Sequence, residues 1–147
     1  MRKAQLTLTL GVAILVAVFG TLISSGGVSL AMERCDFESG RSFDTCVVDG
    51  DTIWVSGINY RLAGFDTPEG HRNLCGGARE RQLAEQATDR LIELMNANEW
   101  TVTSLGSADR FGRVLANLSI AGRDAGAILV EERLARFWPD GEEWWCE

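Results

Sequence analysis

The sequence predicts an α+β fold that contains a small closed β-barrel. Three observations indicate this fold class: short strand-like segments joined by tight turns, one long segment with helical periodicity, and further strands followed by a second helix. The 147 residues suffice for one domain and a tail. A closed barrel suits several short strands because closure leaves no exposed sheet edge.

Segment 1–31 is expected to be a signal peptide or a membrane anchor, with an apolar helix in it. Arg2 and Lys3 precede an uncharged run of 18 residues, 6–23, and small residues follow it. This length fits a long signal core and also a short membrane helix, so both alternatives stay open. In either case we expect 32–147 to be an exported domain, periplasmic or secreted, that meets a membrane only if the segment is retained.

The first three strands are expected at 43–48, 53–55 and 58–65. Aliphatic and aromatic residues fill these segments, and the dipeptides Asp49-Gly50 and Ser56-Gly57 mark the turns between them. Three strands joined by tight turns form a meander.

The longest helix is expected at 78–95, after a loop at 66–77 that is interrupted by Pro68 and several glycines. Its apolar residues recur at helical spacing, namely Leu83, Ala84, Ala87, Leu91, Leu94 and Met95.

The second half of the chain alternates strand, turn and helix. We expect strands at 100–105 and 114–120 around a polar turn, because both segments are rich in β-forming residues. Asp124 is a suitable N-cap for a second helix that runs to about residue 133. A last short strand is expected at 134–138.

The four cysteines all follow the N-terminal segment, and an even number in an exported chain favours two disulfides. Three pairings are open. We favour Cys35 with Cys46, which a hairpin could bring together, and Cys75 with Cys146, which would fasten the tail to the domain. Zinc is a weaker interpretation, because no two cysteines have the close spacing of a zinc motif and His71 is the only histidine.

The acidic charge restricts the kind of partner. The formal net charge is −7, and it becomes −9 for 32–147 once Arg2 and Lys3 are set aside. Broad electrostatic binding of nucleic acid is therefore disfavoured. Because every cation of 32–147 is an arginine, an anion site must be local and depend on geometry.

Asp51 and Asp66 lie at the ends of neighbouring predicted strands, so they can approach each other. Two close carboxylates repel unless a cation or a proton lies between them. An oxygen-only site favours Ca²⁺ or Mg²⁺, with the backbone carbonyl of Thr67 and waters completing the shell.

Three further residues suit the chemistry of phosphate esters. Glu69 follows Asp66 by three residues and can face the same pocket as a general base. Arg61 and Arg113 can each make a two-pronged contact with phosphate oxygens. Together these residues indicate metal-assisted hydrolysis of a phosphodiester.

Three motifs follow one another in an order that resembles the staphylococcal nuclease (thermonuclease) family. They are Val48-Asp49-Gly50-Asp51-Thr52, then Arg61-Leu62 leading to Asp66-Thr67-Pro68-Glu69, then Asp109-Arg110-Phe111-Gly112-Arg113. The resemblance runs from about residue 46 to 138. It implies an SNase-like domain at 32–147 with a five-stranded OB-fold-type barrel, two to three helices, and Ca²⁺-dependent cleavage of DNA and RNA.

The resemblance also implies a role for each site residue. The metal ligands would be Asp51, Asp66 and Thr67, with Mg²⁺ or Mn²⁺ as alternatives to Ca²⁺, and the catalytic residues would be Arg61, Glu69 and Arg113. We expect a monomer that acts on single-stranded DNA or RNA. Phe111 stands where the family prototype has a tyrosine, so contacts with bases differ. The alternative is a catalytically weak barrel that binds nucleic acid or protein, which the negative charge suggests.

Overall fold

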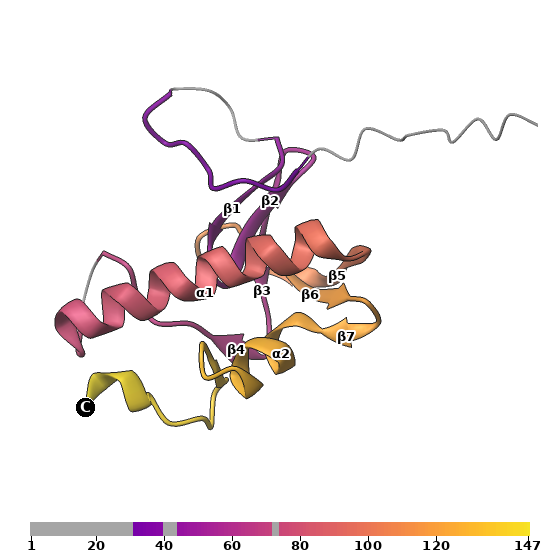
Figure 1. The fold of residues 1–147 in the computed structure, drawn as a ribbon. Coiled ribbons are helices and arrows are strands. Elements are labelled where there is room, and N and C mark those ends of the chain that lie inside the picture. The colour runs from indigo at the N-terminus through magenta and orange to yellow at the C-terminus, as the bar shows by residue number, and fades with distance from the viewer. Residues whose placement is uncertain (1–30, 40–43, 72–73) are drawn as a thin grey trace, which may run out of the picture.

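The computed structural model describes residues 31–39, 44–71 and 74–147 (Figure 1). The expected N-terminal apolar helix falls outside these ranges. The strands are β1 Cys46–Asp49, β2 Thr52–Val55, β3 Ile58–Leu62, β4 Phe65–Asp66, β5 Trp100–Ala108, β6 Val114–Ile120, β7 Arg123–Asp124 and β8 Arg136–Phe137. The helices are α1 Gly77–Ala97, α2 Ala125–Glu131 and the short 3₁₀ helix η1 Trp144–Cys146.

The strands form one mixed sheet and one small separate pair. The main sheet has the order β1-β2-β3-β6-β5, and β7 pairs with β6. The β3–β6 pair is parallel, whereas the other pairs in this sheet are antiparallel. Among the described strands, β1 and β5 end this order without pairing with each other, so the prediction of a five-stranded barrel is confirmed only as a mixed sheet with helices.

The predicted continuous strand 58–65 is wrong. β3 ends at Leu62, and Gly64 has a φ of +85°, a left-handed conformation that glycine adopts without steric cost. The chain then leaves the main sheet, and β4 pairs with β8 instead. This break moves Asp66 away from the strand that carries Arg61 and directs it back toward the Arg61 side chain.

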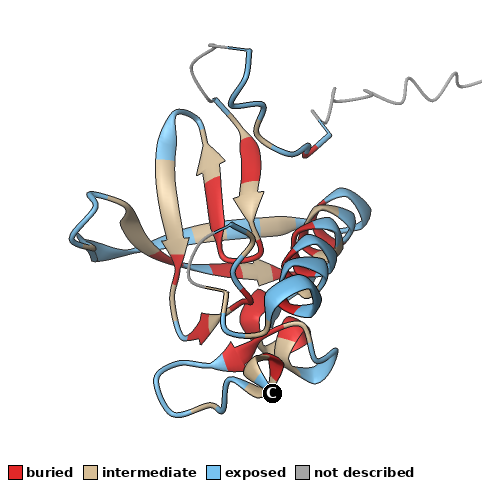
Figure 2. Ribbon diagram, turned by 90° about the vertical axis from the view of Figure 1, so that its left-hand side faces the viewer, coloured by how far each residue is buried: buried red, intermediate tan, exposed pale blue. Residues whose placement is uncertain are grey.

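The predicted helices form close to their expected places. Residues of α1 such as Ala87 and Leu91 are buried, and the outer face of α1 is exposed (Figure 2). The Asp124 side chain accepts a hydrogen bond from the backbone N–H of Ala127 at 2.9 Å, which confirms the N-cap. α2 ends at Glu131, two residues before the predicted end, and the chain turns at Arg133, where φ is +59°.

Both favoured disulfides form, Cys35–Cys46 and Cys75–Cys146. The first fastens residues 31–39 alongside β1, where the N–H of Cys35 donates to the carbonyl of Val47 at 2.8 Å. The second joins η1 to the loop before α1, and the tail lies near the first turn of that helix (Figure 1). None of the helices in the described ranges combines the length and hydrophobicity needed to cross a membrane.

Candidate active site

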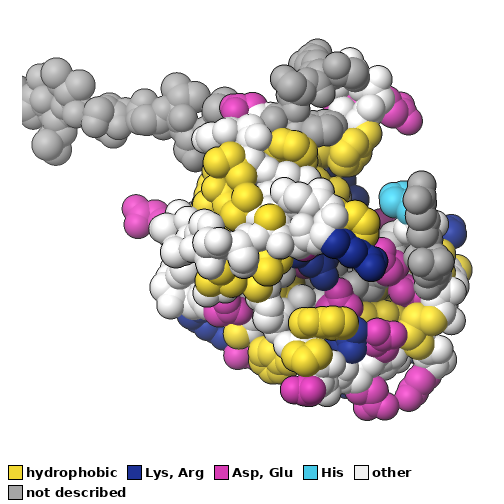
Figure 3. Space-filling view, turned by 180° about the vertical axis from the view of Figure 1, so that it is seen from behind, with side chains coloured by type: hydrophobic (Ala, Val, Ile, Leu, Met, Phe, Trp, Pro, Cys, Tyr) yellow, Lys and Arg dark blue, Asp and Glu magenta, His cyan; other side chains and the backbone are white. Residues whose placement is uncertain are grey.

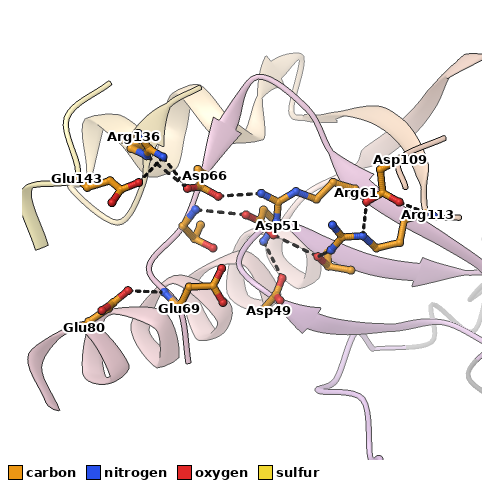
Figure 4. A network of polar contacts seen from close by, with 12 residues as sticks. Asp49, Asp51, Arg61, Asp66, Glu69, Glu80, Asp109, Arg113, Arg136 and Glu143 are labelled. Carbon is orange, nitrogen blue, oxygen red and sulfur yellow. Dashed lines mark hydrogen bonds and ion pairs between the residues drawn. The ribbon is translucent and has the colours of Figure 1, made fainter. Parts of the chain in front are cut away.

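The Arg61 guanidinium lies between the carboxylates of Asp51 and Asp66 (Figure 4). Asp51 lies in the turn between β1 and β2 and is only 2% exposed, while Arg61 is on β3. Arg61 Nη1 contacts Asp51 Oδ1, and Nη2 contacts Asp66 Oδ1 at 2.8 Å. The two carboxylates therefore share one guanidinium, and the prediction that Asp51 and Asp66 approach each other is confirmed.

Asp51 is held from several sides by short-range contacts. Its Oδ1 accepts a hydrogen bond from the Thr52 hydroxyl at 3.2 Å, and its Oδ2 accepts one from the backbone N–H of Thr67 at 3.3 Å. Its own N–H donates to Asp49 Oδ1 at 3.2 Å. Burial raises the pKa of Asp51 well above its usual value, and the charge of Asp49 raises it further, while Arg61 acts in the opposite direction.

Both carboxylate oxygens of Asp66 accept hydrogen bonds from arginines. While Oδ1 faces Arg61, Oδ2 accepts hydrogen bonds from Arg136 Nε at 3.3 Å and Nη2 at 3.1 Å. Arg136 is itself 9% exposed and reaches Glu143 at 2.6 Å. Sequence reasoning missed Arg136, because the residue is 70 positions from Asp66 and belongs to no motif.

Glu69 differs from Asp66 in how it is held. Its side chain is exposed, whereas its backbone N–H donates to Glu80 Oε1 at 3.2 Å. Glu80 is 1% exposed, and its Oε2 accepts the N–H of Gly76 at 2.9 Å, so one carboxylate joins the two ends of the loop before α1. Partial burial raises the pKa of Glu69, with additional contributions from Asp49 and Asp66. The expectation that Glu80 lies on the polar face of the helix is wrong, and its spacing of three and four residues from Leu83 and Ala84 was the signal for its burial.

Arg113 joins the site from the hairpin between β5 and β6. Its Nε contacts Asp109 Oδ2 at 2.7 Å, and its Nη1 contacts the Thr52 hydroxyl at 3.3 Å. Because Thr52 also bonds to Asp51, Arg113 is connected to the Asp51 and Arg61 centre through one side chain. Asp109 stabilises the turn between β5 and β6, since its carboxylate also accepts the N–H of Phe111 at 2.9 Å.

Residues of the candidate site line two cavities. The larger, about 480 Å³, is lined by Arg61, Asp66 and Arg113 together with the exposed aromatic residues Phe111 and Trp138. On the face shown in Figure 3, basic and acidic side chains gather in a hollow with hydrophobic side chains beside it.

Glu69 does not line this cavity. Together with Asp49 it lines the second one, of about 390 Å³, between β1 and α1. The structure thus brings Asp51, Arg61, Asp66 and Thr67 into direct contact and connects Arg113 to them, but it orients Glu69 toward the neighbouring space.

The residues present fit a divalent cation in charge and in chemistry. Among the residues that the structure describes, Arg61 and Arg136 contact the carboxylates of Asp51 and Asp66, and Asp49 and Glu69 add acidic charge nearby. The donors are oxygens, which Ca²⁺ and Mg²⁺ prefer.

Among the described residues, no three of these acids have carboxylate oxygens that all lie within 4.8 Å of one another. Within the ranges described, the group of three candidate ligands whose donor atoms all lie within 4.8 Å of one another is Cys75, Glu143 and Cys146. Its two cysteines form a disulfide, so they offer no thiolates. A cation at Asp51 and Asp66 would therefore rely on two carboxylates, with other oxygens completing its shell.

The fold and the site define an α+β protein in which arginines and buried carboxylates meet beside an aromatic-lined cavity. Comparison with family models gives the particular family: the model described as staphylococcal nuclease homologue matches residues 59–143, more than half of the chain. The chain belongs to this family. No curated protein matches the chain. The matched region begins after Asp51, so the structure, rather than the family match, places Asp51 beside Arg61.

Proposed function

We propose that this protein is a metal-dependent nuclease that hydrolyses phosphodiester bonds of DNA, RNA or both. The observation that carries the proposal is the position of Arg61, which links two carboxylates and also lines the cavity that contains Arg113. A phosphate in this cavity would meet two guanidiniums, and the acids beside it would hold the cation.

The proposed cation is Ca²⁺, with Mg²⁺ or Mn²⁺ as alternatives. Asp51 and Asp66 would hold it, with the carbonyl of Thr67, the residue whose N–H bonds to Asp51, as the further ligand. When bound, such an ion neutralises charge that develops on the phosphate oxygens.

Glu69 is the proposed general base that activates a water molecule. A raised pKa makes a carboxylate a stronger base than an ordinary one, which suits this task. Arg61 and Arg113 are proposed to bind the phosphate and to stabilise the transition state, in which negative charge increases.

The aromatic residues around the larger cavity support a single-stranded substrate. Phe111 is 69% exposed and Trp138 is 57% exposed, and both line the cavity beside the arginines. Unpaired bases can stack on such side chains, whereas bases in a duplex are already stacked on one another.

Export is part of the proposal as well. The two disulfides support an oxidising compartment, periplasmic or extracellular. We propose that the protein acts there as a monomer, and that any membrane contact is made by segment 1–31.

A cleavage assay tests the function. The purified protein is incubated with a single-stranded DNA oligonucleotide at low salt, with Ca²⁺ or with a chelator, beside Glu69→Gln. We expect Ca²⁺-dependent cleavage that Glu69→Gln reduces by roughly a hundredfold or more. Glu131→Gln is the matched control, since Glu131 is exposed and its ion pair within the described ranges is with the surface residue Arg123.

The alternative, a barrel that binds without cleaving, makes a different prediction. The acidic charge suggests it, because electrostatic repulsion of nucleic acid would weaken a nuclease, whereas binding of a protein partner would not be affected in this way. Binding of the oligonucleotide without cleavage in any divalent cation would overturn the proposal and support the alternative.

A further inference from the structure

We propose that Arg136 is a positioning residue that fixes which oxygen of Asp66 faces the cation site, and that the C-terminal segment holds Arg136 in place through Glu143. This inference rests on the proposed function, because it concerns how Asp66 is presented to a cation.

The first step is the strand pairing. β4 and β8 are antiparallel, and Asp66 lies directly opposite Arg136 in their register. Side chains of directly opposite residues lie close together on one face of such a pair. A carboxylate and a guanidinium at these two positions therefore meet without any rearrangement of the backbone.

The second step is the division of the two Asp66 oxygens. Arg136 donates to Oδ2 from both Nε and Nη2, at 3.3 and 3.1 Å. Oδ1 remains for the Arg61 side, where it shares one guanidinium with Asp51 Oδ1. Two donors on one oxygen prevent the carboxylate from rotating freely, so Oδ1 is the oxygen presented beside Asp51.

The third step is the outer support of Arg136. Its Nη1 donates to the carbonyl of Gly141 at 2.8 Å, and its Nη2 contacts Glu143 at 2.6 Å (Figure 4). The guanidinium also lies 5.0 Å from the centre of the Trp138 ring. Arg136 is thus fixed by the residues that follow it in the chain.

The C-terminal segment is itself anchored. Trp145 is 2% exposed, and the Cys75–Cys146 disulfide attaches this segment to the loop before α1. Contacts around a metal-binding carboxylate typically change metal affinity by tenfold to a hundredfold when they are lost. The C-terminal segment is therefore expected to influence Ca²⁺ affinity through Glu143 and Arg136.

The test compares Arg136→Gln, Arg136→Lys and Glu143→Gln with the unmodified full chain. Calorimetry without substrate measures the affinity for Ca²⁺. A Ca²⁺ titration of oligonucleotide cleavage gives the half-activating concentration of Ca²⁺. Thermal unfolding in the presence of a chelator gives the melting temperature of the metal-free protein. We expect Arg136→Gln to weaken Ca²⁺ binding by roughly tenfold or more, with little change in KM for the oligonucleotide. Arg136→Lys should bind Ca²⁺ more tightly than Arg136→Gln and more weakly than the unmodified chain. Glu143→Gln should also weaken Ca²⁺ binding, by a smaller factor than Arg136→Gln.

Arg123→Gln is the control, because Arg123 is exposed and its ion pair is with the surface residue Glu131. If Arg136→Gln lowers the melting temperature but keeps wild-type Ca²⁺ affinity, Arg136 is merely structural and the inference is overturned. If Arg136→Gln does not fold, unchanged affinity in both Arg136→Lys and Glu143→Gln overturns it. The proposed function fails separately, when the unmodified chain neither binds Ca²⁺ nor cleaves.

Discussion

Asp66 and Glu69 are three residues apart, and the structure holds them in opposite ways. Both oxygens of Asp66 contact arginines, from β3 on one side and β8 on the other. Glu69 is held by its backbone, through the buried Glu80, while its side chain is exposed. The comparison indicates that Asp51, Arg61 and Asp66, here called the charge-binding centre, are held in place by side-chain contacts. The position of the proposed base, Glu69, depends instead on the loop before α1.

The largest effect should come from the charge-binding centre. Arg61→Gln removes the cation that Asp51 and Asp66 share, and also a proposed phosphate contact. We expect nuclease activity to fall by about a hundredfold to a thousandfold. Steady-state cleavage of the oligonucleotide at saturating Ca²⁺ measures this change.

The same variant has a second expected property. Without Arg61, buried Asp51 lies near other acids with no partner cation, so in chelator the free energy of unfolding should fall by about 3 kcal/mol. Added Ca²⁺ should recover more stability in Arg61→Gln than in the wild type. Equal recovery, measured by urea unfolding of both proteins, would indicate that the cation does not bind at these carboxylates.

Glu80→Gln, which changes the residue that holds the loop before α1, should lower the free energy of unfolding. Each carboxylate oxygen of Glu80 accepts one backbone N–H, and an amide offers only one oxygen for the two. One partly buried donor then lacks this partner, which costs about 1 kcal/mol. Urea unfolding beside Glu85→Gln, an exposed residue of the same helix, checks this; similar values for the two variants would contradict it.

Gly50→Ala should disturb Asp51 through a clash with Thr67. A Cβ at this position would lie 2.7 Å from Thr67 Cγ2 and 2.9 Å from the Cβ of Ala87. Overpacking of this kind typically costs about 1–2 kcal/mol, and here it would push Thr67 away from Asp51. Stability and Ca²⁺ affinity should both decrease, and an unchanged Ca²⁺ affinity would show that Thr67 is not needed in its present place.

The smallest effect is expected far from both regions, at the surface pair Arg90 and Glu132. The hydrogen bond from Arg90 lowers the pKa of Glu132 below its usual 4.5. A lowered folded-state pKa stabilises the protein above the unfolded-state value, and this contribution disappears as pH falls through the folded-state value. Glu132→Gln should therefore cost about 0.5 kcal/mol near neutral pH and nothing in strong acid. A loss that is equal at both pH values would exclude the ionic origin.

Much of this arrangement could be predicted from the sequence because it depends on local signals. The period of α1, the Asp124 cap and the turns beside Asp51 are all local, and the approach of Asp51 to Arg61 follows from the pairing of β2 with β3, in which Thr52 lies opposite Arg61. The break at Gly64 could not be predicted, because an apolar run on both sides resembles one strand.

The partners of the site residues were the least predictable part. Arg136 meets Asp66 only because β8 returns to pair with β4, and side-chain spacing along the chain carries no information about a contact across 70 residues. The buried role of Glu80 likewise depends on how the loop before α1 closes. The catalytic and metal-binding roles of the predicted residues stay proposals.

Equilibrium binding of Ca²⁺ in the absence of substrate tests the central claim most directly. Calorimetry should show binding to the unmodified protein, a loss of at least tenfold in affinity for Asp51→Asn and Asp66→Asn, and near wild-type affinity for Arg113→Gln, which belongs to the phosphate side. Full Ca²⁺ affinity in both aspartate variants, or no binding to the unmodified protein, would contradict a cation site at the carboxylates that Arg61 joins.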